Sequence, residues 1–301
     1  MKRQRYRQYT AETMGPVVIG GVGGSGTRVV AEITEALGYY LGDDLNSAKD
    51  NFWYTLLFKR PHWYRTHRDD KRQISTGLSL LSKLMMSREA PTPTELIFLV
   101  RAVVTMSLQG HDQRGSGRGF WPLVRLWRML SVPKHHGNSY VGWGWKEPNS
   151  HLLISDLAAY FSECKYILTI RNGLDMAFSK NQQQLHNWGE LYDVEAPASP
   201  ADVPRVSLKY WVRANRSALE AGRALGRRRF DVVNFDRLCS HPASEIDKMV
   251  NFLGVSPDAA ILKRVVSLPR TPASQGRYRG RDLRQFDDDD LAELENLGFS
   301  I

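Results

Sequence analysis

Residues 16–28 read PVVIGGVGGSGTR, and this stretch decides how the rest of the 301-residue chain is interpreted. Its apolar start, Val17–Ile19, is typical of a buried strand, and apolar residues from Val29 onward recur at helical spacing. A glycine-rich loop lies between them. Glycines let backbone N–H groups approach an anion closely, and a helix N-terminus adds partial positive charge. The segment therefore predicts a cradle for phosphate or sulfate, with a simple strand–helix turn as the alternative.

The loop departs from the P-loop that binds ATP and GTP. That motif requires Gly-x4-Gly followed by Lys and then Ser or Thr. Gly21 and Gly26 have the required separation, but Thr27 and Arg28 come next, so the lysine is missing.

The dinucleotide fingerprint GxGxxG does match, at Gly21, Gly23 and Gly26. Asp43 and Asp44 follow at about the distance of a ribose contact. A Rossmann-type oxidoreductase that binds NAD(P) or FAD is therefore one candidate. A nucleotide that carries a sulfuryl group is another, and residues farther along the chain distinguish the two.

The composition fits a globular protein that binds anions. The chain is 42% hydrophobic, enough for a sizeable core, and its formal net charge is +9. No RNA- or DNA-binding signature is present, so we expect no nucleic-acid partner.

Two cysteines, Cys164 and Cys239, suggest neither a disulfide framework nor a metal cluster. Without a signal-peptide core or an apolar run long enough to span a membrane, we expect a cytoplasmic protein, for which peripheral membrane contact stays compatible.

Apolar segments alternate with helical patterns along the chain, which favours an α/β fold with a parallel sheet. We expect strands at residues 17–20, 39–41, 140–145, 166–170 and 231–235, and helices at 29–37, 152–161, 206–225, 243–253, 258–266 and 288–297. Asp43 and Asp44 lie at the carboxyl end of the second strand. Ligands bind at this edge in open α/β sheets.

Residues 47–131 are predicted to be mainly helical and contain two segments rich in aromatic and basic residues. Residues 58–72, FKRPHWYRTHRDDKR, fit either an exposed connector or part of an acceptor-binding surface. Residues 120–130, FWPLVRLWRML, have helical spacing, and we expect this helix to pack by its apolar face.

A second strand–loop–helix unit follows the clearest buried strand, residues 166–170. Arg171 leaves the strand end, and Ser179 is expected two turns along the next helix. Both side chains could reach one dianionic phosphate, the arginine through its planar fork. Asp175, in the first turn, is expected to cap backbone N–H groups of that helix.

This R-N-x-x-D-x-x-x-S pattern, with the strand–GxxGSGT–helix unit upstream, resembles the sulfotransferases that use 3′-phosphoadenosine 5′-phosphosulfate (PAPS), in the branch that sulfates glycans or peptides. The resemblance implies a P-loop-NTPase-like sulfotransferase fold. One α/β domain, residues 1–301, would have a central parallel sheet flanked by helices, with residues 47–131 as a helical insertion on the acceptor side. In this family Arg171 and Ser179 would hold the 3′-phosphate. The residues implied to cradle the 5′-phosphosulfate are Gly23, Gly24, Ser25, Gly26, Thr27 and Arg28.

Three further segments resemble the same family. Lys146 matches a Lys-x-Pro element near the reacting sulfate, and residues 232–254 resemble the family's YEDL…P…FLG segment. Gly276–Arg279 resembles the basic segment that closes over the nucleotide, which adds Arg277 and Arg279 to the implied nucleotide-binding residues.

The sequence also departs from the family at two positions. Gly24 stands where the family usually has Lys or Arg, a cation that stabilises charge as the sulfate leaves; one such donor is worth about 3–4 kcal/mol of barrier. Arg28 and Lys146 are the candidate substitutes. Phe235 replaces the family's tyrosine, so a hydroxyl contact is lost.

The reaction implied is in-line transfer of a sulfuryl group from PAPS to a hydroxyl or amine, which depends on positioning and electrostatics. The resemblance points to Asp43 or Asp44 as the general base, and we select Asp44; Glu147 and His151 are rival bases. Lys146 would stabilise the leaving phosphate or the sulfuryl oxygens. No metal is expected, because sulfate has fewer charges to neutralise.

The acceptor is left open between an acidic glycan, a lipid headgroup and a peptide, all of which suit a basic surface. The alternatives to a sulfotransferase are the Rossmann-type oxidoreductase, which leaves Arg171 and Ser179 unexplained, and a non-catalytic protein that binds a nucleotide or polyanion, which Gly24 favours.

Overall fold

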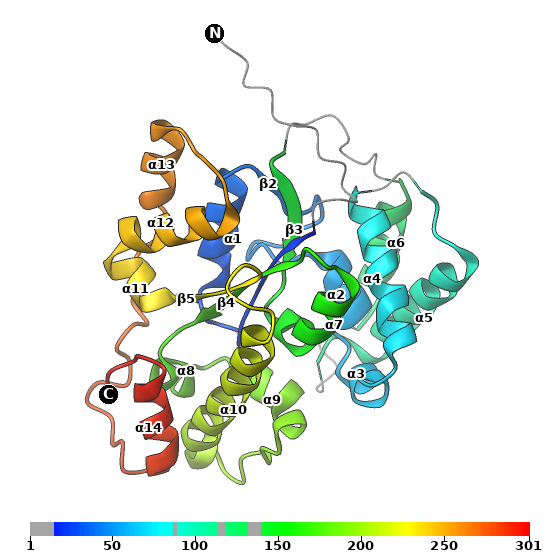
Figure 1. Cartoon of the computed structure of the whole chain (residues 1–301). Helices are drawn as coiled ribbons and strands as arrows, with labels where there is room; N and C mark the ends of the chain where they lie inside the picture. Colours follow the sequence, from blue (N-terminus) through cyan, green and yellow to red (C-terminus); the bar gives the residue numbers. More distant parts are fainter. Residues whose placement is uncertain (1–14, 87–88, 113–117, 132–139) are drawn as a thin grey trace.

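The structure is a computed structural model that describes residues 15–86, 89–112, 118–131 and 140–301 (Figure 1). Within these residues five strands form one sheet with the order β2-β3-β1-β4-β5, and every pairing is parallel. The strands are β1 (Val17–Gly20), β2 (Tyr39–Tyr40), β3 (Gly142–Lys146), β4 (Lys165–Ile170) and β5 (Phe230–Asn234). All lie within one or two residues of the predicted segments, so the predicted α/β class with a central parallel sheet is confirmed.

Helices flank the sheet on both sides (Figure 1). Those before β3 are α1 (Thr27–Ala36), α2 (Phe52–Phe58), α3 (Pro61–His67), α4 (Lys71–Met86), α5 (Pro93–Gln109) and α6 (Trp121–Ser131). Those between β3 and β5 are the 3₁₀ helix η1 (Pro148–Leu153), α7 (Ile154–Tyr160), α8 (Gly173–Ala177), α9 (Gln183–Trp188), η2 (Gly189–Tyr192), η3 (Pro200–Asp202) and α10 (Val203–Arg223). After β5 come α11 (Phe235–Ser240), α12 (Pro242–Leu253), α13 (Ala259–Val266) and α14 (Asp288–Asn296).

Two apolar cores sandwich the sheet because successive strand residues point to opposite faces. Val17 and Ile19 pack on one side with α1, α12 and α13. Val18 packs on the other with residues from α2, α4, α5, α7 and α10. Burial on both faces explains why β1 and β4 are nearly continuous apolar runs in the sequence.

Residues 58–72 do not form the exposed connector that was one of the two expectations. Residues 61–67 form α3, in which Trp63 and Tyr64 are buried. The guanidinium carbon of Arg60 lies 4.2 Å from the Trp63 ring centroid, and Arg60 donates two hydrogen bonds to the Leu57 carbonyl, 3.0 and 2.8 Å long. Aromatic packing and a buried arginine therefore order this segment.

The 120–130 helix does pack by apolar residues, as expected: Pro122 and Met129 of α6 are buried, and Trp121 and Leu126 are partly buried against the core. A second apolar side of α6 was not expected: Leu123, Val124 and Leu130 are exposed, and Trp127 has an exposed fraction of 66%. Arg125 is half-buried, and its guanidinium carbon lies 4.1 Å from the centroid of the Phe52 ring. In the described parts of the chain, no helix is both long and apolar enough to cross a membrane.

The start of α1 is fixed by a close contact with the end of β5. Gly26 is the N-cap of α1 with φ 89°, in the left-handed region, where a side chain is strained. A Cβ built on Gly26 would lie 2.1 Å from Cδ2 of Phe235. The buried ring of Phe235 therefore packs directly on the backbone of the glycine loop.

We predict that Gly26→Ala lowers the free energy of unfolding by about 2–5 kcal/mol. Forcing alanine into the left-handed region costs about 1–2 kcal/mol, and overpacking against the ring costs about 1–3 kcal/mol. Urea unfolding measures the change. Gly280→Ala is the matched control, because Gly280 has φ +77° with no heavy atom within 4 Å of a built Cβ. Equal losses in the two variants would contradict the Phe235 contact.

Candidate functional site

The carboxyl ends of the strands bring most of the predicted site residues to one edge of the sheet. The glycine loop follows β1, and Arg171 follows β4, its direct neighbour. Lys146 ends β3, and Asp44 follows β2. This edge is where parallel α/β sheets bind ligands.

The glycine loop depends on left-handed backbone. Gly21, Gly24 and Gly26 have φ of 151°, 95° and 89°. The backbone N–H of Ser25 donates to the Val22 carbonyl at 3.1 Å, and the Ser25 hydroxyl donates to the same oxygen. The Ser25 hydroxyl thus stabilises the turn, and it would have to rotate to reach a phosphate.

Side chains of α8 and α9 lie against this loop. A Cβ built on Gly23 would lie 2.7 Å from the Gln184 side chain, and one on Gly24 would lie 3.2 Å from that of Met176. Together with its positive φ, this contact disfavours any side chain at Gly24. The cation that the family usually has at this position would therefore be strained on the backbone as it stands here.

Arg171 is 8% exposed and faces the same edge. Its Nη2 donates to the Ser274 hydroxyl at 2.9 Å and lies 3.4 Å from Oδ2 of Asp175. Its guanidinium carbon lies 5.7 Å from the centroid of Phe235, the ring that also packs on Gly26. Within the part of the chain that the structure describes, the buried Nε of Arg171 has no hydrogen-bond partner. The loop and Arg171 therefore flank one aromatic ring, and the arginine keeps a free donor.

The expectation that Asp175 caps its own helix is wrong. The cap of α8 is Asn172, whose side chain accepts from the backbone N–H groups of residues 174 and 175. The Asp175 carboxylate instead accepts from the backbone N–H groups of Gly276 and Arg277, at 2.9 and 2.8 Å. Asp175 thereby fastens the basic C-terminal segment to the strand end that carries Arg171.

The two arginines of that segment differ in their surroundings. Burial and the positive charge of Arg171 lower the pKa of Arg277, whose Nε donates to the Ser274 carbonyl at 3.1 Å. Arg279 is exposed and lines a cavity of about 170 Å³ that Asp236 also lines. The guanidinium groups of Arg171 and Arg277 are close enough for one to lower the pKa of the other, and two such cations form a site that favours an anion.

Ser179 is not two turns along a helix as expected, because α8 ends at Ala177. The side-chain amide of Gln182 donates to the carbonyls of Met176, Ala177 and Ser179, at 3.2, 3.0 and 2.8 Å, and so occupies the acceptors that a longer helix would use. Ser179 is half-buried, and its hydroxyl accepts from the backbone N–H of Asn181 at 3.3 Å.

The two candidate cations lie in contrasting places. Lys146 is buried; its Nζ donates to the Ala48 carbonyl at 2.9 Å and to the Asp50 carboxylate. The side chain of Arg28 is 59% exposed, with its Nε 3.7 Å from Glu32 one helical turn along α1. Lys146 is therefore held at the sheet edge, whereas Arg28 is free to change its rotamer.

Asp44 is 4% exposed and is held by α6. Its Oδ1 accepts from Nη1 of Arg125 at 2.7 Å and from Nη1 of Arg128 at 2.8 Å. Its Oδ2 has no hydrogen-bond partner among the described residues. One carboxylate oxygen is thus fixed by two arginines, and the other remains available to accept a proton. Asp43, by contrast, is exposed and accepts from the Tyr40 hydroxyl at 2.8 Å.

Glu147 is fully buried, and burial raises its pKa. Its Oε2 accepts from the Asn149 backbone N–H and its Oε1 from the Asn149 side-chain amide, both at 2.7 Å, while Nζ of Lys59 lies 3.8 Å away. Both oxygens are engaged in capping η1, so Glu147 has a structural role. In the described residues, no group of three or more His, Cys, Asp or Glu side chains is placed to hold a metal ion.

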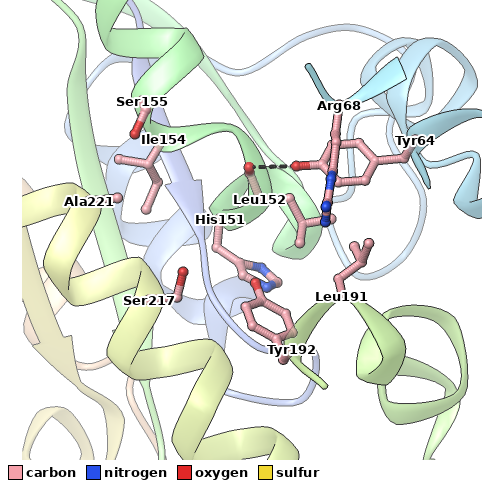
Figure 2. A pocket seen from close by; sticks show the side chains of 10 residues that line it. All are labelled: Tyr64, Arg68, His151, Leu152, Ile154, Ser155, Leu191, Tyr192, Ser217 and Ala221. Carbon is pink, nitrogen blue, oxygen red and sulfur yellow. Dashed lines mark hydrogen bonds between the residues drawn. The ribbon is translucent and has the colours of Figure 1, made fainter. Parts of the chain in front are cut away.

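His151, the other rival base, lines a cavity of about 210 Å³ shown in Figure 2. Its Nδ1 lies 2.9 Å from the Pro148 carbonyl, which can only accept, so Nδ1 carries the proton. No described residue lies within hydrogen-bond distance of the buried Nε2, which presents a lone pair. Burial lowers the pKa of His151 to about 4, so the ring is neutral at pH 7 and is a weak base.

Several residues at this edge were not predicted: Asp50, Arg125, Arg128, Met176, Gln184 and Ser274. The spacing of Arg125 and Arg128, three residues apart on one helix face, is the one local signal that sequence reasoning had available. The other four are placed by tertiary packing.

Comparisons with known proteins bear on the family and the fold. A profile described as "Sulfotransferase family" matches residues 16–259. The sulfotransferase domain from the curacin biosynthetic pathway is similar in structure, with a TM-score of 0.50 and 12% identity over 96% of this chain and 99% of that one. The sulfotransferase domain of the Synechococcus PCC 7002 olefin synthase has a TM-score of 0.48 and 14% identity over 100% of both chains. STF9 from Mycobacterium avium has a TM-score of 0.44 and 14% identity over 84% of this chain and 67% of that one. No curated protein matches the chain.

We predict that His151 makes the protein less stable in acid. In the folded protein its pKa is about 4, below the ordinary histidine value of 6.5. The unfolded state therefore binds the proton more tightly, and stability falls as the pH drops from 6.5 towards 4. Between pH 7.5 and pH 5 this group removes about 2 kcal/mol. Urea unfolding of the wild type and of His151→Gln at both pH values measures the difference. An identical pH dependence in the variant would show that His151 does not titrate as described.

Proposed function

Since the chain belongs to the sulfotransferase family, we propose that it transfers a sulfuryl group from PAPS to a hydroxyl or amine of an acceptor. The observation that carries this proposal is the placement of the glycine loop and Arg171 at the ends of neighbouring strands, flanking Phe235. A doubly phosphorylated nucleotide requires two anion sites of this kind at one edge. A Rossmann-type oxidoreductase has no use for the second site, and the family assignment argues against it.

The residues of the edge suit such a nucleotide. Backbone N–H groups of Gly23–Thr27 would hold the 5′-phosphosulfate at the N-terminus of α1. Arg171 would bind the 3′-phosphate through its unpartnered Nε, with Ser179 as a second donor. Arg277 and Arg279 would close over the nucleotide, since Asp175 fastens their segment beside Arg171.

PAPS supplies an activated sulfuryl group. The protein would position the acceptor, remove its proton and stabilise the negative charge that develops during transfer. We assign Asp44 as general base: its free Oδ2 would take the proton of the acceptor as the new S–O or S–N bond forms and the bond from sulfur to the 5′-phosphate breaks. Lys146, once released from Asp50, would stabilise the developing negative charge, and Arg28 is the second candidate for that role.

We further propose that residues 1–301 form one sulfotransferase-like domain in which residues 47–131 lie on the acceptor side. The contacts of Arg125 and Arg128 with Asp44 support this, because they join the helical insertion to the proposed base. An acidic glycan, a lipid headgroup or a peptide would suit the net charge of +9.

Two measurements test the proposal. Calorimetric titration should show binding of adenosine 3′,5′-bisphosphate and none of NAD(P). Incubation with ³⁵S-labelled PAPS and a panel of glycans, phospholipids and tyrosine peptides should label at least one of them. Nucleotide binding with no labelled acceptor would favour a non-catalytic binding protein instead.

We predict that Arg171→Ala weakens the binding of adenosine 3′,5′-bisphosphate by about 1.5–3 kcal/mol, the worth of a hydrogen bond to a charged group. Calorimetry measures the affinity. Arg284→Ala is the control, because the Arg284 side chain is 91% exposed and pairs with Asp282. Unchanged affinity in the Arg171 variant would remove this residue from the nucleotide site.

We predict that Asp44→Asn lowers kcat by about 100- to 10,000-fold, the usual contribution of a general base, with the affinity for adenosine 3′,5′-bisphosphate retained. Asp43→Asn, which alters the exposed neighbour, should keep most of the activity. Transfer of ³⁵S to the labelled acceptor gives the rates. The reverse pattern would assign the base to Asp43.

A further inference from the structure

The outer surface of α5 and α6 carries an unusual concentration of apolar side chains. Of the 15 large hydrophobic residues exposed in the described part of the chain, ten lie on or beside these two helices, so they form a patch and are not scattered. We call this patch the α5–α6 face. Its residues are Leu96, Ile97, Val100, Val104, Leu108, Phe120, Leu123, Val124, Trp127 and Leu130.

The face consists of two helical stripes. Along α6 and the residue before it, Phe120, Leu123, Trp127 and Leu130 recur at intervals of three or four and so share one side of the helix. Phe120 is 83% exposed and Trp127 is 66% exposed. On α5 the exposed residues likewise follow one side. The opposite side of α5 is buried in the core, and the two helices contact each other. The fold therefore does not use the α5–α6 face for its own packing.

The charges beside the face are of one sign. Arg101 and Arg118 are exposed, and the Arg128 side chain is 46% exposed. In the described part of residues 90–131 the acidic residues are Glu95 and Asp112, and both are buried. A second copy of the same face would therefore bring Arg101 and Arg118 against the same arginines, with no exposed carboxylate among the described residues of 90–131 to pair them. A surface that is both anionic and apolar would complement the arginines and the exposed hydrophobic side chains.

We propose that the α5–α6 face docks on an anionic lipid bilayer. Helices that bind at the boundary between headgroups and acyl chains carry tryptophan, phenylalanine and leucine on one face and basic residues beside it. Each arginine near an anionic leaflet adds electrostatic attraction. The docked surface includes α6, the helix whose Arg125 and Arg128 hold Asp44 of the candidate site. The docking itself does not depend on the proposed chemistry.

Co-sedimentation of the full chain with vesicles tests the proposal without any nucleotide. The protein should bind phosphatidylcholine vesicles that contain phosphatidylserine, and bind vesicles of phosphatidylcholine alone more weakly. Leu123→Glu combined with Trp127→Glu should lower binding by about tenfold or more, because apolar burial is lost. Arg118→Gln should lower it by about fivefold, and only when phosphatidylserine is present.

Leu262→Glu is the matched control, because Leu262 is a single exposed leucine, 40% exposed, on α13 at the other side of the sheet. It should bind vesicles like the wild type. Circular dichroism and light scattering of each variant verify the fold and the mass. No binding to vesicles that contain phosphatidylserine would overturn the proposal, as would equal binding by the Leu123/Trp127 variant. A dimer that this variant dissociates, without vesicle binding, would assign the face to a second copy of the chain.

Discussion

The candidate site depends on the parallel pairing of β1 with β4. Val17 pairs with Lys165 and Gly20 with Leu168, so the glycine loop leaves β1 beside Thr169. The approach is close enough that a Cβ on Gly21 would lie 2.3 Å from the Thr169 carbonyl oxygen. Because parallel strands end at the same edge, this register places the loop next to Arg171. A shift of one residue would turn the side chains of the strand to the opposite faces and separate the two anion sites.

The second constraint is electrostatic and joins distant parts of the chain. Asp175 accepts two backbone hydrogen bonds from residues 276 and 277, about one hundred positions later. This carboxylate holds Arg277 near Arg171, and burial together with the repulsion between the two like charges lowers the pKa of Arg277. A bound phosphate would relieve that repulsion. A carboxylate also joins distant parts of the chain at the other end of the edge, where one oxygen of Asp44 pairs with both Arg125 and Arg128.

Much of the fold could be predicted from local patterns. The strands are short apolar runs. The glycines of the loop predict a turn, because only glycine readily adopts the positive φ angles found there. The failures have tertiary causes. Gln182 ends α8 before Ser179, and Asp175 binds a remote segment in place of its own helix end. The second, exposed apolar side of α6 was missed because periodicity identifies apolar residues without saying whether they meet the core or the outside.

The central claim is that one nucleotide bridges the glycine loop and Arg171, and a crystal structure of the full chain with adenosine 3′,5′-bisphosphate tests it most directly. The 5′-phosphate should accept hydrogen bonds from backbone N–H groups of Gly23–Thr27, and the 3′-phosphate should contact the Arg171 guanidinium. A nucleotide bound with either phosphate away from this edge of the sheet would contradict the account.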